Sequence, residues 1–292
     1  MTGKRILILG ADGMVGQCLY SYLSKNIDLT VYGTTRKKNT NKTTFILRAD
    51  HLLEDFSEIP KVDFIINCIG KLKGSNEEKL KSINEEFPKN LVKILLDTQT
   101  VLIHISTDAV FDELSKIVTE SSIPNPNELY GKSKLQGEIN SSPHITIRTS
   151  FLGIGEKGLL NWVQNNQDQN LAGFTNQLWS GCTTLQFAKL CEDLILDSNI
   201  KKNLKNTHML HFAPIGPISK YEIIQNIVEV FGINKKVVPQ KSNEITRILR
   251  SEILDLKGNL RYTDSIQNAL TELILFDKNE EEKTSIHPRN KT

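Results

Sequence analysis

The sequence contains few cysteines, and the four that it has are far apart. Cys18, Cys68, Cys182 and Cys191 form no CxxC pair, so the sequence predicts buried, reduced thiols and neither a disulfide framework nor a metal site. No apolar run approaches membrane-spanning length, and a strand pattern begins at Lys4, too early for a signal peptide. We therefore expect a cytoplasmic protein without a membrane partner.

An excess of charge of one sign is also missing. The chain has 36 basic and 34 acidic residues, which leaves a net charge of +2. This balance gives no electrostatic reason to expect a nucleic-acid partner. The 292 residues, of which 38% are apolar, suffice for one large domain or for one domain with a smaller companion.

A glycine-rich turn lies between a candidate strand and a candidate helix. The apolar run 4–10 is typical of a strand buried on both faces, and three glycines in the pattern GxxGxxG join it to a helical segment. Gly10 permits the tight turn, Gly13 lets a pyrophosphate approach the backbone, and Gly16 lets the helix pack on the sheet. A purely structural turn is the alternative. The residues expected to contact a dinucleotide here are Gly10, Asp12, Gly13, Met14, Val15 and Gly16.

An acidic residue is missing after the second candidate strand, 29–33. In NAD-specific folds an acid at this place binds the ribose 2′-hydroxyl. This chain has Thr-Thr-Arg-Lys-Lys at 34–38 instead. Arg36 and Lys37 would suit a 2′-phosphate, so the sequence favours NADPH as the cofactor, with NADH left open. The alternative is a solvated basic turn.

Further candidate strands alternate with helices, at 44–48, 62–68, 101–106 and 145–149. A long helix is expected at about 76–98, interrupted or kinked near Pro88. This alternation predicts an α/β fold with a doubly wound parallel sheet of the Rossmann type. Because such sheets bind ligands at their carboxyl edge, we expect cofactor contacts there from Asp50, Cys68, Ile69, Gly70, Asn84 and Ser106.

Tyr130 and Lys134 are four residues apart in a segment that is expected to be helical from about Glu128. That spacing places both side chains on one helix face. A fixed cation nearby lowers the pKa of a phenol from its ordinary value of about 10. Such a phenol could protonate an alkoxide or accept the proton of an alcohol. For the bare spacing, an ordinary surface helix is the alternative.

The sequence predicts two parts and a tail. Residues 1–152 are expected to form the dinucleotide-binding domain, to which a helix near 185–197 returns. Residues 153–276 are expected to be mainly a smaller, substrate-binding part, in which Trp179 lines the pocket and Trp162 lies in the core. The polar residues 277–292 are expected to be a disordered tail.

The ordered motifs resemble the extended short-chain dehydrogenase/reductase superfamily, and within it the sugar-nucleotide reductases of the dTDP-4-dehydrorhamnose reductase type. The resemblance is strong over roughly the first 200 residues. It is carried by Gly10-Ala-Asp-Gly-Met-Val-Gly16, Ser106-Thr-Asp-Ala-Val-Phe111, Tyr130-Gly-Lys-Ser-Lys-Leu-Gln-Gly-Glu138 and Arg148-Thr-Ser-Phe-Leu-Gly153.

The resemblance implies an NADP(H)-dependent reduction of the C4 keto group of a nucleotide-linked 4-keto-6-deoxy sugar, in deoxysugar and surface polysaccharide synthesis. In this reading Thr107 binds the reacting oxygen and Tyr130 is the general acid. Lys134 binds the nicotinamide ribose and depresses the pKa of Tyr130. The substrate would be a nucleotide-diphosphate sugar held by Thr107, Asp108, Ala109, Phe151, Trp179 and Arg247.

Departures from the family pattern leave some questions open. Ala109 stands where the family often has tyrosine, so the sugar is not specified. Gln17 and Cys18 stand where some relatives carry a carboxylate ligand of a dimer-bridging metal, so no such metal is expected. A sugar-nucleotide 4-epimerase and a non-catalytic NADP-binding regulatory subunit are the alternatives. The intact Thr107, Tyr130 and Lys134 argue against the regulatory subunit. The oligomeric state is open, with a homodimer as one option.

Overall fold

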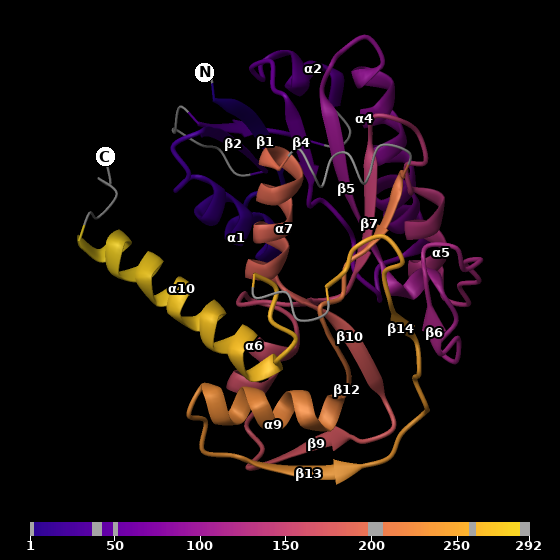
Figure 1. Ribbon diagram of the computed structural model, residues 1–292, viewed down its shortest axis with the longest axis vertical. Coiled ribbons are helices and arrows are strands. Elements are labelled where there is room, and N and C mark those ends of the chain that lie inside the picture. Colours follow the sequence, from indigo (N-terminus) through magenta and orange to yellow (C-terminus); the bar gives the residue numbers. More distant parts are fainter. Residues whose placement is uncertain (1–2, 37–42, 49–51, 198–206, 257–260, 287–292) are drawn as a thin grey trace.

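A parallel sheet forms the centre of the larger part of the molecule. The computed structural model describes residues 3–36, 43–48, 52–197, 207–256 and 261–286, so Lys37 and Asp50 lie outside the described residues. Within these ranges the sheet has seven parallel strands in the order β11-β7-β5-β4-β1-β2-β3 (Figure 1). The strands are β1 Lys4–Leu9, β2 Leu29–Thr35, β3 Thr44–Ile46, β4 Phe64–Asn67, β5 Val101–Thr107, β7 Ile145–Thr149 and β11 Met209–His211. The prediction of a doubly wound parallel sheet is confirmed.

Alternating side chains of the apolar strands build two cores, one on each face of the sheet. Ile6 and Ile8 of β1 pack with Phe187 against α1 (Met14–Leu23) and α7 (Thr184–Leu196). Leu7 and Leu9 pack on the other face with α2 (Leu52–Ser57) and α4 (Phe87–Leu95). Because successive side chains of a strand point to opposite faces, one continuous apolar run supplies both cores.

The helix expected at 76–98, interrupted or kinked near Pro88, is divided into three segments. These are α3 (Glu77–Leu80), a π-helical segment (Lys81–Glu86) and α4. Pro88 lies in the first turn of α4, directly after the π-helical segment, so an interruption near this proline is observed. The irregularity therefore precedes the proline, and it lies beside α5 (Leu129–Gln136).

A smaller part follows the carboxyl edge of the sheet, because β7 continues almost directly into β8 (Phe151–Leu152), which pairs with β10 (Leu178–Thr183). Its own core joins α6 (Leu159–Asn165), α9 (Lys220–Val230) and the start of α10 (Ile266–Ile286). Figure 1 shows this part below the large sheet. The remaining strands are β6 Ile117–Val118, β9 Asn170–Phe174, β12 Ile215–Ser219, β13 Lys236–Gln240 and β14 Ile248–Leu249.

The second half of the chain returns to the large sheet twice. The expected return near 185–197 is α7, which packs on α1, and β11 also pairs with β7 at the edge of the sheet. The disordered tail expected from residue 277 is helical as far as Ile286, since α10 continues through it. Among the described residues, no helix is both long and apolar enough to cross a membrane.

Gly137 allows a close approach between α5 and the π-helical segment. A Cβ at this position would lie 1.8 Å from the carbonyl oxygen of Asn84. We expect Gly137→Ala to lower the free energy of unfolding by about 1–3 kcal/mol, because the two elements must move apart. Urea denaturation measures the change. Gly70→Ala is the matched control, since its Cβ would meet nothing closer than 3.7 Å. Equal stabilities of the two variants would contradict this reading of the packing.

Candidate active site

The glycine turn fits a pyrophosphate. Gly10 has a φ of +77°, and a Cβ at Gly16 would lie 2.2 Å from the carbonyl oxygen of Gly10. Gly13 precedes α1 without a side-chain cap, which leaves the first N–H groups of the helix available to an anion. Asp12 is exposed, and Met14 and Val15 are half-buried. The cradle that bulkier residues would fill is therefore present at the expected place.

The structure places an acid beside the end of β2, although residues 34–38 contain none. The hydroxyl of Thr35 at the end of β2 donates to the carboxylate of Asp12. Arg36 follows directly and is exposed. A basic and an acidic group therefore both lie at the end of the strand that reads the adenosine ribose in this fold.

The buried side chain of Asn84 connects three elements by hydrogen bonds. Its Oδ1 accepts from the backbone N–H of Lys71 at 2.8 Å, and its Nδ2 donates to the hydroxyl of Ser133 at 3.1 Å. This side chain joins the loop after β4 to the π-helical segment and to α5. Of the other residues predicted at this edge, Gly70 is exposed and Cys68 and Ile69 are half-buried. Burial raises the pKa of the Cys68 thiol, which therefore stays protonated.

Thr107 ends β5, and Tyr130 and Lys134 lie on α5. The ammonium of Lys134 is buried and donates to the carbonyl oxygen of Ile105 at 2.6 Å. Burial lowers the pKa of Lys134 to about 8, against the opposing effect of the Glu138 carboxylate. The side chain of Thr107 lies beside the phenol of Tyr130 and acts on its pKa. The structure thus brings the three residues predicted to be catalytic to one place.

The pKa of Tyr130 is raised rather than lowered. Burial is the largest cause, and the neighbouring Asp108 carboxylate acts in the same direction. The Thr107 side chain and the guanidinium of Arg247 oppose this shift. The cation that acts on the phenol is therefore Arg247, where the sequence predicts Lys134.

Glu138 organises the back of the site. Its carboxylate accepts from Arg148 Nη2 at 2.7 Å and from the hydroxyl of Ser106 at 2.6 Å. The side chains of this ion pair are only 5% and 6% exposed. The hydroxyl of Ser106 therefore donates its proton to a carboxylate. Glu138 follows Lys134 by four residues, but its role was not predicted from the sequence.

Arg247 is held inside the site. Its Nε donates to Asp108 Oδ2 at 3.0 Å, and its Nη1 donates to the carbonyl oxygen of Phe111 at 3.0 Å. Ala109 lies in the same turn and is half-buried. Arg247 and Asp108 are both predicted to contact the substrate, and in the structure they form an ion pair with each other.

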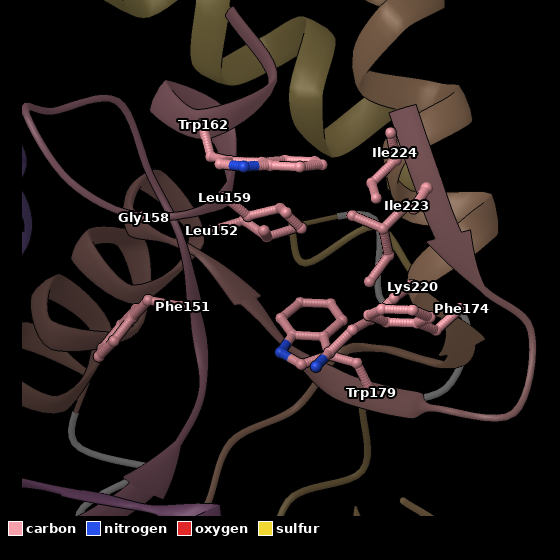
Figure 2. Close-up of a pocket in the computed structure, with 11 residues that line it drawn as sticks. Phe151, Leu152, Gly158, Leu159, Trp162, Phe174, Trp179, Lys220, Ile223 and Ile224 are labelled. Carbon is pink, nitrogen blue, oxygen red and sulfur yellow. The ribbon is translucent and has the colours of Figure 1, made fainter. Parts of the chain in front are cut away.

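A cavity of about 500 Å³ lies in the smaller part. Trp162 and Trp179, the chain's two tryptophans, face it from opposite sides (Figure 2). The core position expected for Trp162 is wrong, because its side chain is 40% exposed and lines the cavity. Phe151 also lines it, as Figure 2 shows, with its ring to one side. The other lining residues are Leu152, Gly158, Leu159, Ala172, Phe174, Lys220, Ile223 and Ile224.

Lys220 is the charged residue among those that line the cavity, and it was not predicted from the sequence to be a site residue. Its ammonium donates to Gln177 Oε1 at 2.6 Å. Burial lowers its pKa, and the charges that act on it include Asp108 and Arg247. Thr107, Tyr130 and Lys134 are not among the residues that line this cavity. Among the described residues, no cluster of His, Cys, Asp and Glu could hold a metal ion.

The buried Lys134 makes the stability of the protein depend on pH. Its pKa is about 8 in the fold and near 10.5 in the unfolded chain, so between these values the unfolded chain binds more protons. The free energy of unfolding therefore rises with pH in this window. We expect the wild type to gain about 2 kcal/mol relative to Lys134→Met between about pH 8 and pH 10. Lys132 is at an exposed position of the same helix, so the wild type should gain no stability relative to Lys132→Met over this pH range. Urea titrations measure both differences. Parallel pH curves for wild type and Lys134→Met would contradict the assignment.

The chain is similar in sequence to one protein family and to several individual proteins. The family model of the RmlD substrate binding domain matches residues 4–252. Methionine adenosyltransferase 2 subunit beta of Xenopus tropicalis is 32% identical over 147 residues, which are 47% of this chain and 42% of that subunit. The match thus spans less than half of that relative. The probable low-salt glycan biosynthesis reductase Agl14 of Haloferax volcanii is 36% identical over 240 residues, 73% of this chain and 75% of that protein.

Solved structures show the same fold. A dTDP-4-dehydrorhamnose reductase of Clostridium acetobutylicum superposes with a TM-score of 0.76 at 26% identity, over 94% of this chain and 99% of that one. The Bacillus anthracis enzyme in complex with NADP gives a TM-score of 0.75 at 21% identity over 93% and 99%. A Bacillus cereus UDP-glucuronic acid 4-epimerase with NAD gives 0.69 at 19% over 94% and 96%. The predicted resemblance is confirmed, and the chain belongs to the RmlD family of extended short-chain dehydrogenases/reductases.

Proposed function

We propose that the chain is an NADP(H)-dependent reductase of the C4 keto group of a nucleotide-linked 4-keto-6-deoxy sugar, acting in the cytoplasm in deoxysugar and surface polysaccharide synthesis. The observation that carries this proposal is the convergence of Thr107, Tyr130 and Lys134 at the carboxyl edge of the sheet. This is the edge at which open α/β sheets bind their ligands. Function is argued from this site, because the fold alone hosts several activities.

The protonation of Tyr130 suits a reduction. Its raised pKa keeps the phenol protonated at neutral pH, so it can donate a proton to the oxygen of a ketone as that oxygen becomes an alkoxide. The hydroxyl of Thr107 lies beside the phenol and would bind the same oxygen. The nicotinamide, when bound, supplies the hydride. Lys134, fixed by the Ile105 carbonyl, would bind the nicotinamide ribose.

The cavity suits the nucleotide end of the substrate. Trp162 and Trp179 offer two flat apolar faces on which a base can stack, and Lys220 offers an ammonium to the diphosphate. The sugar would then extend towards Ala109 and Phe151.

The end of β2 supports NADPH but also accommodates NADH. The exposed Arg36 would meet a 2′-phosphate, while Asp12 beside Thr35 would accept a ribose hydroxyl. We propose NADPH as the preferred cofactor, because a guanidinium binds a phosphate by charge-assisted hydrogen bonds.

Replacement of Tyr130 by phenylalanine tests the reaction. Tyr130→Phe should lower kcat by about 10²- to 10⁴-fold, because the proton donor is lost while the ring remains. The affinity for NADPH should stay nearly unchanged, and fluorescence titration with the cofactor measures it. Full turnover in the variant would contradict the assignment of Tyr130 as the proton donor.

Replacement of Arg36 tests the cofactor. Arg36→Ala should weaken NADPH binding about tenfold and leave NADH binding unchanged, since only the phosphate loses its charged partner. Isothermal titration with both cofactors provides the comparison. If both affinities fall equally, or neither falls, Arg36 does not read the 2′-phosphate.

A non-catalytic regulatory subunit is the second candidate. It is favoured by the similarity to methionine adenosyltransferase subunits beta. The two candidates separate in an assay of NADPH consumption with dTDP-, GDP- and UDP-linked 4-keto sugars. Consumption with one of them supports the reductase. No consumption with any of them, in a protein that binds NADPH, supports the regulatory subunit or a 4-epimerase that retains its cofactor.

A further inference from the structure

We propose that the Asp108–Arg247 ion pair positions Thr107 and places its two charges beside the phenol of Tyr130. The proposal rests on the catalytic site described above and adds two positioning residues to it. Neither residue needs to touch the reacting atoms. Each acts through a neighbour that does.

The pair is directly connected to Thr107. Asp108 Oδ2 accepts from Arg247 Nε at 3.0 Å, and Asp108 Oδ1 accepts from the hydroxyl of Thr107 at 3.0 Å. The side chains of Arg247 and Asp108 are 14% and 17% exposed, so solvent screens their charges less than at an open surface. Because Asp108 also binds Arg247, this contact fixes the position of the Thr107 side chain.

The backbone holds Arg247 in place from both sides. Arg247 directly precedes β14, which pairs in parallel with β6. On its other side, the N–H of Thr246 donates to the carbonyl oxygen of Glu113 at 2.8 Å. The N–H of Leu249 donates to the hydroxyl of Ser180 at 2.9 Å. The segment that carries Arg247 is thus fastened to the loop after β5 and to β10. An arginine fixed in this way is a permanent part of the site and not a mobile surface side chain.

The turn of Asp108 also touches the catalytic helix. A Cβ at Gly131 would lie 2.0 Å from the carbonyl oxygen of Ala109, so α5 begins in close contact with this turn. The charged groups that act on the phenol of Tyr130 are therefore Asp108 from the turn and Arg247 from the segment before β14. Lys134 lies on the same helix as Tyr130, and the neutral Thr107 completes the surroundings.

The two members of the pair act on the phenolate with opposite sign. Asp108 raises the pKa of Tyr130 and Arg247 lowers it. When the pair is intact, the two effects oppose each other. Removal of one member leaves the other charge without its partner beside the phenol, so the two removals should move the pKa in opposite directions.

Two neutral variants test the proposal without any substrate. The ionisation of Tyr130 can be followed by ultraviolet difference absorbance, with Tyr130→Phe subtracted to remove the other five of the chain's six tyrosines. Arg247→Gln should raise the pKa of Tyr130, and Asp108→Asn should lower it. The double variant should return it towards the wild-type value. Shifts of both single variants in the same direction, or no shift in either, would overturn the proposal.

Two further variants separate charge from structure. Arg247→Lys keeps the charge but loses the fork of the guanidinium, so it should restore most of the Tyr130 pKa that Arg247→Gln changes. Arg250→Gln removes an exposed charge from the same segment and should leave this pKa unchanged. A pKa in Arg250→Gln that moves as far as in Arg247→Gln would contradict the specific pair. Thermal unfolding of each variant confirms that the fold is kept.

The pH dependence of turnover gives a second readout. Reduction requires the protonated phenol, so kcat/KM falls at high pH as Tyr130 ionises. This fall should move to higher pH in Arg247→Gln and to lower pH in Asp108→Asn. A chain that binds NADPH without turnover would refute the reductase and still allow the absorbance titration, so the two proposals fail separately.

Discussion

The buried ammonium of Lys134 is the group around which the catalytic region is arranged. A charge removed from water is costly unless polar groups surround it, and Lys134 meets the carbonyl oxygen of Ile105 and the nearby Glu138. Glu138 in turn is bound by Arg148 and Ser106. One buried cation therefore requires an organised set of partners from α5, β5 and β7. The strands fix the place of the helix on which Tyr130 stands.

Glycines let the catalytic helix come close enough for this arrangement. Gly131 lies against the carbonyl of Ala109, and Gly137 lies against the carbonyl of Asn84. Side chains at these two positions would push α5 away from the turn after β5 and from the π-helical segment. The amide of Asn84, which binds Ser133, adds a polar contact between the same elements. The position of the phenol thus depends on backbone packing as much as on its own neighbours.

The fold and the meeting of Thr107, Tyr130 and Lys134 could be predicted because their signals are local. An apolar run, a glycine turn and a helical spacing each lie within about a dozen residues, and parallel strands bring their carboxyl ends to one edge. The π-helical segment, the lining role of Trp162 and the helical start of the expected tail could not be predicted in this way. Each depends on what lies opposite in space, such as the cavity that Trp162 faces.

The sequence by itself determined that Thr107, Tyr130 and Lys134 would meet at the carboxyl edge of a doubly wound sheet. Only the tertiary structure decided which charges surround them. Asp108 and Arg247 are far apart along the chain, and they meet because β14 pairs with β6. Burial, which no local pattern specifies, raises the pKa of Tyr130 and lowers that of Lys134. The physical reason is that the energy of a charge depends on the solvent and partners that the whole fold leaves to it.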